Sequence, residues 1–300
     1  MTRMTGQWAV TASVVVAMLC AVAPRSMAQG ATAEPLLVRR HQEGDWFSYL
    51  MAGRNNDSAY EVRLTATVLR DAAGRLVEEY AWSDLVIDGI PRQLTPPSRE
   101  FRQAVTLNGD APFVFPDLSR LQPGLIGPVT DLLTFYADLF LAMHAGQLRA
   151  PGDRFLVRRD VPNSWADGTV VLVGEGAIDF NITLTDIDRT NGVADVLVKH
   201  VVPEEPAIQI PAAWMHAPVA DTPNNWVQVR YEGDRYVAAV GQETFDVDLS
   251  FSLESGRILR ATMVNPVETV VRDCADIELT DCGEPRHRRI FRRVEMLAAD

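Results

Sequence analysis

The sequence predicts a mainly β fold: a strongly curved, half-barrel-like antiparallel meander of about ten or eleven strands around one central amphipathic helix. Apolar and polar residues alternate in most segments after residue 45, as in strands with one buried face. Short turn signals such as Asn191-Gly192 separate these segments, which is typical of hairpins. Only the segment 128–145 has helical periodicity. A β-sandwich with one helix is the alternative architecture.

The alternation is clearest at 60–68, where Tyr60, Val62 and Leu64 alternate with polar residues. The hairpin signal at 189–192 joins two further strands of the same kind. These two strands are expected at 178–184 and 196–202. The remaining strands are expected at 76–82, 101–107, 155–157, 227–231, 236–240, 245–251, 258–264, 267–271 and in a last segment that ends near residue 297. Because these strands are short and joined by turns, they predict antiparallel neighbours.

The helix at 128–145 is expected to begin at Pro128, where the missing N–H costs nothing, and to stop at Gly146. One arc of the helical wheel is apolar: Val129, Leu132, Leu133, Phe135, Tyr136, Leu139, Phe140 and Met143. Asp131, Thr134 and Asp138 lie opposite this arc. The helix is therefore expected to pack mainly by one face against the concave side of the sheet.

Residues 1–28 are typical of a secretory signal peptide. Arg3 precedes an uncharged apolar run at 8–23, which is shorter than the roughly 20 residues of a spanning helix. Ser26 and Ala28 place small residues where signal peptidase I requires them, which predicts cleavage after Ala28 and a periplasmic or secreted protein. Residues 29–44 form a lead-in without a strand pattern, for which disorder is one interpretation, and 45–300 form a single β-rich domain.

Composition limits the partners. The formal net charge is −12, and signal removal makes it more negative because residues 1–28 contain two arginines and no acidic residue. Such a surface repels nucleic acid, so a nucleic-acid partner is not expected. No segment after residue 28 is long and apolar enough to predict a membrane span.

Two cysteines remain after signal removal, Cys274 and Cys282. In an oxidising compartment they allow one intramolecular disulfide, across a short polar loop. A metal pair is the alternative, but only His287 lies close enough in sequence to add a ligand. The sequence therefore predicts a disulfide, and no metal or cofactor.

No sequence motif for catalysis or phosphate binding is present, and the five histidines are scattered. A hydrolase whose site assembles from distant residues is one alternative function. The segment 286–293 is the only basic cluster. Two interpretations are open for it: an anion site, or pairing with the acidic residues around the disulfide loop, Asp273, Asp276, Glu278, Asp281 and Glu284.

The export signal, the meander over residues 45–297 and the helix on its concave face resemble the half-barrel envelope carriers of the lipoprotein-carrier (LolA/LolB) type. The resemblance concerns element order and includes no diagnostic motif. It implies non-enzymatic binding of an apolar or lipidic ligand between sheet and helix. The expected ligand-binding residues are Phe135, Tyr136, Leu139, Phe140 and Met143 along one wall, with Trp214 and Met215 at the rim. A structural or protein-interaction domain of the envelope with a filled core is the alternative, and its partner would be an envelope protein.

Overall fold

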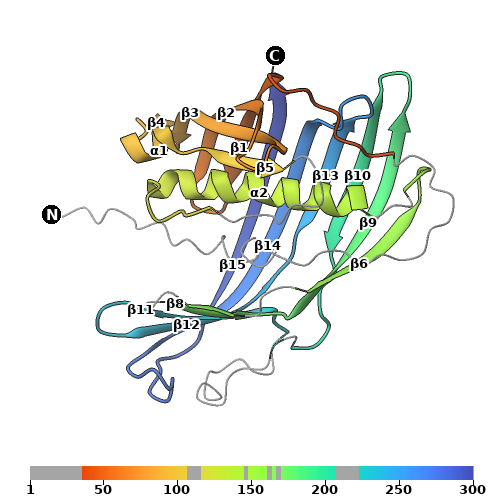
Figure 1. Cartoon of the computed structure of the whole chain (residues 1–300). Coiled ribbons are helices and arrows are strands. Elements are labelled where there is room, and N and C mark those ends of the chain that lie inside the picture. The colour runs from red at the N-terminus through yellow and green to blue at the C-terminus, as the bar shows by residue number, and fades with distance from the viewer. Residues whose placement is uncertain are drawn as a thin grey trace.

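The computed structural model describes residues 36–106, 116–144, 148–160, 164–166, 170–206, 208 and 223–299. These residues form one antiparallel sheet of 15 strands with one long helix against it (Figure 1). The predictions of a mainly β fold, antiparallel pairing and a single long helix are confirmed. The described strands belong to one connected sheet, whereas the sandwich alternative requires two. The signal peptide lies outside the described residues.

The N-terminal strands form one end of the sheet. They are β1 (Trp46–Arg54), β2 (Ala59–Arg70), β3 (Leu76–Ile87), β4 (Ile90–Pro91) and β5 (Gln103–Thr106), with the short helix α1 (Pro96–Glu100) before β5. β1 to β4 pair in sequence order, and β5 pairs with β3. β1 also pairs with the last strand of the chain, with Leu50 opposite Leu297. This pairing joins the two ends of the domain directly.

The later strands complete the sheet. They are β6 (Arg154–Asp160), β7 (Ser164–Ala166), β8 (Val170–Gly174), β9 (Ala177–Asp188), β10 (Val193–His200), β11 (Trp226–Tyr231), β12 (Tyr236–Glu243), β13 (Asp246–Ser252), β14 (Ile258–Cys274) and β15 (Arg286–Ala299). The total exceeds the expected ten or eleven because several strands, such as β4 and β7, are too short to show a periodic pattern.

β14 is one continuous strand, although the sequence pattern predicted two that break near Pro266. On one side β14 pairs first with β13, up to Val264 opposite Asp246, and then with β12, from Val267 opposite Glu243. Pro266 lies at the change of partner, where the ladder is interrupted. A proline cannot donate a backbone hydrogen bond, and this is a position where no regular donor is required.

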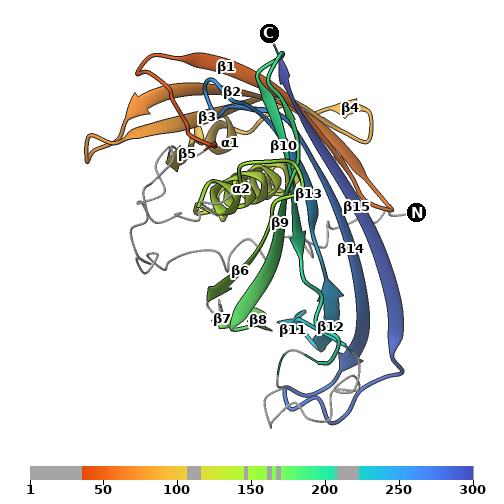
Figure 2. The ribbon, with the colours of Figure 1, turned by 90° about the vertical axis from the view of Figure 1, so that its right-hand side faces the viewer.

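The sheet bends around the long helix, as Figure 2 shows, but it is neither closed nor strongly curled. The expected strong, half-barrel curvature is therefore not found. Closure requires edge strands to bond to each other, and β5 and β6 each bond to one neighbour among the described strands. Alternation along a strand determines which face is buried, but it contains no information on how far a sheet curls.

The long helix α2 (Pro123–His144) begins five residues before the expected position, so Pro128 lies inside it rather than at its start. A proline in a helix removes one hydrogen bond and restricts the residue before it. That residue is Gly127, which has no Cβ to clash with the proline ring. This sequence context allows the helix to continue through Pro128.

α2 is buried on nearly all sides, so the expected division into one packed and one solvent-facing side is wrong. Asp131, Thr134 and Asp138 are at most 6% exposed. The Thr134 hydroxyl donates to the carbonyl of Thr130, 3.0 Å away, which satisfies it within the helix. The expectation that no segment after residue 28 is long and apolar enough for a membrane span is wrong for α2, which is long and apolar enough by length and composition. However, 83% of its most apolar window is buried inside the protein, as in a core helix.

The side chains form two hydrophobic cores. The larger core surrounds α2, and the smaller one lies between β11, β12, β14 and the disulfide loop, where Ile208 is buried. The predicted disulfide between Cys274 and Cys282 is confirmed. Cys274 is buried in the smaller core, so the disulfide joins the end of β14 to that core.

The free energy of unfolding is expected to depend on pH through Asp138, because burial raises the pKa of its carboxyl to about 8. Between an unfolded pKa of about 4 and the folded pKa, the unfolded chain loses its proton first, so stability falls as the pH rises. We expect Asp138→Asn to be about as stable as the wild type at pH ~4 and more stable at pH ~8 by roughly 1–3 kcal/mol. Urea unfolding at both pH values measures the difference, and an equal difference at both would contradict the assignment.

Candidate functional site

The structure brings the described residues of the predicted wall together on α2, but they have different surroundings. Phe135 and Leu139 are at most 2% exposed, and Tyr136 is 3% exposed. Phe140 and Met143, nearer the C-terminal end of the helix, are only half-buried. Trp214 and Met215 lie outside the described residues, so their place at a rim stays a prediction.

The first half of α2 is packed without space for a ligand. Leu125, Val129, Leu132, Leu133 and Phe135 have no surface that a water molecule reaches, within the rounding of the values. A void large enough for an acyl chain would expose the side chains around it to water-sized probes. This part of the interior is therefore filled, as in ordinary protein cores.

A buried polar cluster lies beside Tyr136, where α2 faces β3. The hydroxyls of Tyr80 and Tyr136 donate to Oε2 of Glu78 over 2.7 and 2.8 Å. Oε1 of Glu78 pairs with the guanidinium of Arg39, which also lies 4.8 Å above the ring of Tyr136. The Glu78 and Tyr80 residues are completely buried. One carboxylate is thus neutralised by one arginine and bound by two phenols.

Arg39 reaches this cluster from the segment 36–44, which precedes the first strand. The Arg40 amide donates to the Ser255 carbonyl over 2.8 Å, and this bond holds the segment against the β13–β14 turn. Gly256 in that turn has a φ of +70°, and a Cβ there would lie 2.3 Å from the Val38 carbonyl oxygen. Only glycine allows both this turn and the close passage of the segment.

His41 lies on the same side of the segment, with Nε2 3.2 Å from Oε1 of Glu78. Burial, followed by the nearby charge of Arg39, lowers the pKa of His41 to about 4. The imidazole is therefore neutral at neutral pH, and Arg39 supplies the positive charge that Glu78 requires. The cluster acts as a structural support of the core, because the side chains of Arg39, His41 and Glu78 are at most 4% exposed.

A second buried ion pair joins α2 to the last strand. The carboxylate of Asp131 pairs with Arg292 of β15 and accepts a hydrogen bond of 2.5 Å from the hydroxyl of Tyr60. Burial lowers the pKa of Arg292. Burial also raises the pKa of Tyr60 above its usual range, so the phenol stays protonated and donates. Asp131 on the polar face of the helix is thus paired inside the protein rather than solvated by water.

The C-terminal half of α2 contacts the edge strand β6, and the side chains at this contact are only partly buried. Inward-facing Phe155 and Val157 of β6, like Met143 of α2, are only partly buried. The guanidinium of Arg159 lies 5.3 Å from the centre of the Phe140 ring. Desolvation by burial lowers the pKa of Arg159. No described carboxylate forms an ion pair with Arg159, so an apolar surface here lies next to an uncompensated cation.

The basic segment 286–293 is partly neutralised by acidic residues on neighbouring strands. Arg286 pairs with Asp273 over 2.5 Å, and Arg289 pairs with Glu268 over 2.6 Å across the β14–β15 ladder. Asp273 belongs to the acidic set around the disulfide loop. The geometry thus favours pairing over an anion site for this segment.

Sequence reasoning missed both buried ion pairs, although a signal was present. Glu78 lies between Leu76 and Tyr80 on the inward face of β3, and Arg292 precedes Val294 and Met296 on the inward face of β15. A charge in register with buried apolar residues indicates a buried partner. The partners Arg39 and Asp131 are far away in sequence, so no spacing could identify them.

The fold and these clusters define a β-sheet protein with one buried helix, two internal ion pairs and a group of partly buried apolar side chains between α2 and β6. No protein-family model matches this chain, and no curated protein matches it either. Among the residues that the structure describes, no three histidine, cysteine, aspartate or glutamate side chains are close enough to hold a metal ion.

Proposed function

We propose that this protein is an exported envelope protein that binds an anionic amphiphile, such as a fatty acid, without catalysis. The apolar tail would lie between the C-terminal end of α2 and the edge strand β6. The single observation that carries the proposal is Arg159, a partly buried cation next to partly buried apolar side chains and without a described carboxylate partner.

The apolar part of the proposed site comes from Phe140 and Met143 of α2 and from Phe155 and Val157 of β6. Partly buried apolar side chains gain free energy when a ligand removes their remaining surface from water, about 25 cal/mol per Å². Phe135 and Leu139 of the same helix are at most 2% exposed and have little surface left to offer a ligand. The proposed site thus takes the outer part of the wall predicted from the sequence.

The polar part of the proposed site is the guanidinium of Arg159. A carboxylate head group would form a charge-assisted hydrogen bond with this guanidinium. Burial has already removed part of the water around Arg159, so binding requires little further desolvation. Arginine also suits this position, 5.3 Å from the centre of the Phe140 ring, because a guanidinium can interact with an aromatic face and still donate hydrogen bonds from its N–H groups. An anionic head group is therefore favoured over a neutral one.

Export to the periplasm or beyond is part of this proposal and is based on residues 1–28. The disulfide between Cys274 and Cys282 supports it weakly, because structural disulfides are rare in reducing compartments. The resemblance to envelope carriers also supports export only weakly, because it concerns the order of the elements and includes no shared motif.

Titration of the purified protein with a fluorescent fatty acid tests the proposal. We expect saturable binding in the micromolar range, and weakening of about tenfold in Arg159→Gln because a charge-assisted bond is lost. Arg158→Gln is the matched control: Arg158 is the next residue of β6, but it is exposed on the opposite face of the strand and pairs with Asp179. We expect this control to bind like the wild type.

An envelope scaffold that binds another protein is the second candidate. It is favoured by the void-free packing between Leu125 and Phe135, which leaves no room for a ligand along the first half of α2. The scaffold becomes the better explanation if the wild-type protein does not bind the fatty acid. It also does so if Arg159→Gln binds the fatty acid as tightly as the control Arg158→Gln.

A further inference from the structure

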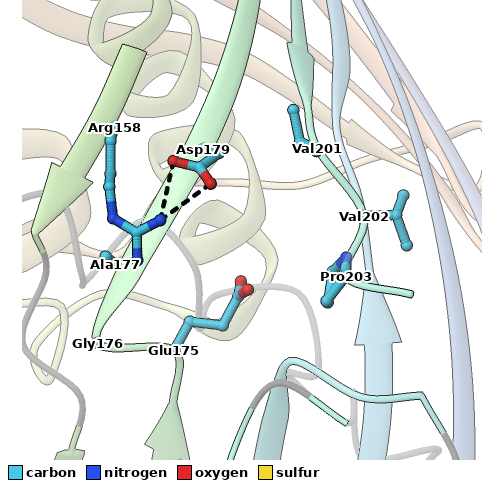
Figure 3. Close-up of a pocket in the computed structure, with 8 residues that line it drawn as sticks. All are labelled: Arg158, Glu175, Gly176, Ala177, Asp179, Val201, Val202 and Pro203. Carbon is cyan, nitrogen blue, oxygen red and sulfur yellow. Dashed lines mark hydrogen bonds and ion pairs between the residues drawn. The ribbon is translucent and has the colours of Figure 1, made fainter. Parts of the chain in front are cut away.

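A separate pocket of about 390 Å³ lies at the ends of β9 and β10, away from the amphiphile site. Figure 3 shows its lining: Arg158, Glu175, Gly176, Ala177, Asp179, Val201, Val202 and Pro203. Arg158 and Asp179 face each other on one side, and the Val201–Pro203 segment forms the other. The carboxylate of Glu175 is directed into the space between them.

The charges of this pocket do not cancel. Arg158 Nη1 lies 3.1 and 3.4 Å from the two carboxylate oxygens of Asp179, so these two residues neutralise each other. Glu175 pairs with no described arginine or lysine: its described ion pair is with the imidazole of His200, whose Nε2 lies 3.4 Å from Glu175 Oε2 and which is charged only when protonated. This contact lacks hydrogen-bond geometry, and both ring nitrogens of His200 are buried without a described hydrogen-bond partner.

Glu175 is also partly removed from water, because its side chain is only 13% exposed. A partly desolvated carboxylate whose described partner is an imidazole, rather than a permanent cation, lowers its free energy by binding a cation. Nonpolar walls at Val201, Pro203 and Ala177 suit the methylene carbons next to such a cation rather than a hydrated metal ion.

We propose that this pocket binds a single primary ammonium or guanidinium group, with Glu175 as its anionic partner. The carboxylate accepts hydrogen bonds from the cation, and Val201 and Pro203 contact its alkyl stem. The cation could come from a small free molecule or from a lysine or arginine side chain of a partner protein, and these two sources share the same chemistry. The proposal is independent of the amphiphile site, since Arg158 and Arg159 point to opposite faces of β6.

NMR titration of the purified protein with methylguanidinium tests the proposal. We expect saturable shifts of the Gly176 and Ala177 amides, with a Kd on the order of 1 mM. In Glu175→Gln, which keeps the size of the side chain, we expect at least tenfold weaker binding. Glu205→Gln is the matched control, because Glu205 is exposed and lies two residues after the lining residue Pro203 but outside the lining itself.

A second variant, Val202→Lys, introduces an ammonium group at the partly exposed wall of the pocket. We expect it to compete with the probe and abolish the shifts while Glu175 is intact. Repeating the titration with a blocked Gly-Arg-Gly peptide separates the two sources: tighter binding than methylguanidinium indicates a partner side chain, and equal binding indicates a free cation. Absence of saturable shifts, or unchanged binding in Glu175→Gln, overturns the proposal.

The fatty-acid titration on the same variants keeps the two proposals apart. Glu175→Gln is expected to bind fatty acid normally, and Arg159→Gln is expected to bind methylguanidinium normally. Failure at one site therefore leaves the conclusion about the other site intact.

Discussion

Arg39→Met is expected to destabilise the protein by about 3–5 kcal/mol, because it leaves the carboxylate of Glu78 buried without a counter-charge. Glu78 is completely buried, and the Arg39 side chain is only 3% exposed, so water cannot replace the lost charge. The phenols of Tyr80 and Tyr136 still donate to Glu78, but they are neutral and do not balance it.

Urea unfolding of the wild type and variants measures this effect. Arg40→Met, the neighbouring exposed arginine, is the control and is expected to change stability by less than about 1 kcal/mol. The double variant Arg39→Met/Glu78→Gln removes both charges and is expected to recover much of the loss, because a neutral amide costs less to bury than a carboxylate. Equal effects of Arg39→Met and Arg40→Met would show that the segment 36–44 is not part of the folded core.

Phe135→Ala is expected to cost about 3–5 kcal/mol, as other truncations of fully buried aromatic residues do. Phe135 has no exposed surface, and the packed core around it cannot collapse fully into the space left behind. Phe140→Ala, one helical turn later, is expected to cost less than about 2 kcal/mol because half-buried Phe140 loses less contact.

The two phenylalanine variants also distinguish stability from binding. Phe135→Ala should lower the urea midpoint strongly and leave the fatty-acid affinity of the folded fraction nearly unchanged. Phe140→Ala should change the urea midpoint less and weaken fatty-acid binding, since the Phe140 ring contacts Arg159 in the proposed site. If Phe140→Ala proves as destabilising as Phe135→Ala, the C-terminal half of α2 is a filled core and the scaffold function gains support.

The segment 36–44 shows where prediction from sequence stopped. It has no strand periodicity, which predicts only a lead-in to the domain. In the structure, however, the side chains of Leu37, Arg39 and His41 are turned to the same side and are buried or nearly so. The ion pair with Glu78 depends on the segment crossing the β13–β14 turn at Gly256. No local pattern encodes a contact between segments this far apart in the chain.

The sequence alone determined the local features. Alternating apolar residues, hairpin turns and two cysteines in a short loop act over a few residues, and the corresponding strands, the antiparallel pairing and the disulfide are present in the structure. The tertiary structure alone decided how far the sheet curls, that Asp131 and Asp138 are buried, and which cations face the buried carboxylates. The physical reason is that burial and charge pairing depend on distance in space, whereas a sequence pattern reports only the neighbours along one strand or one helix.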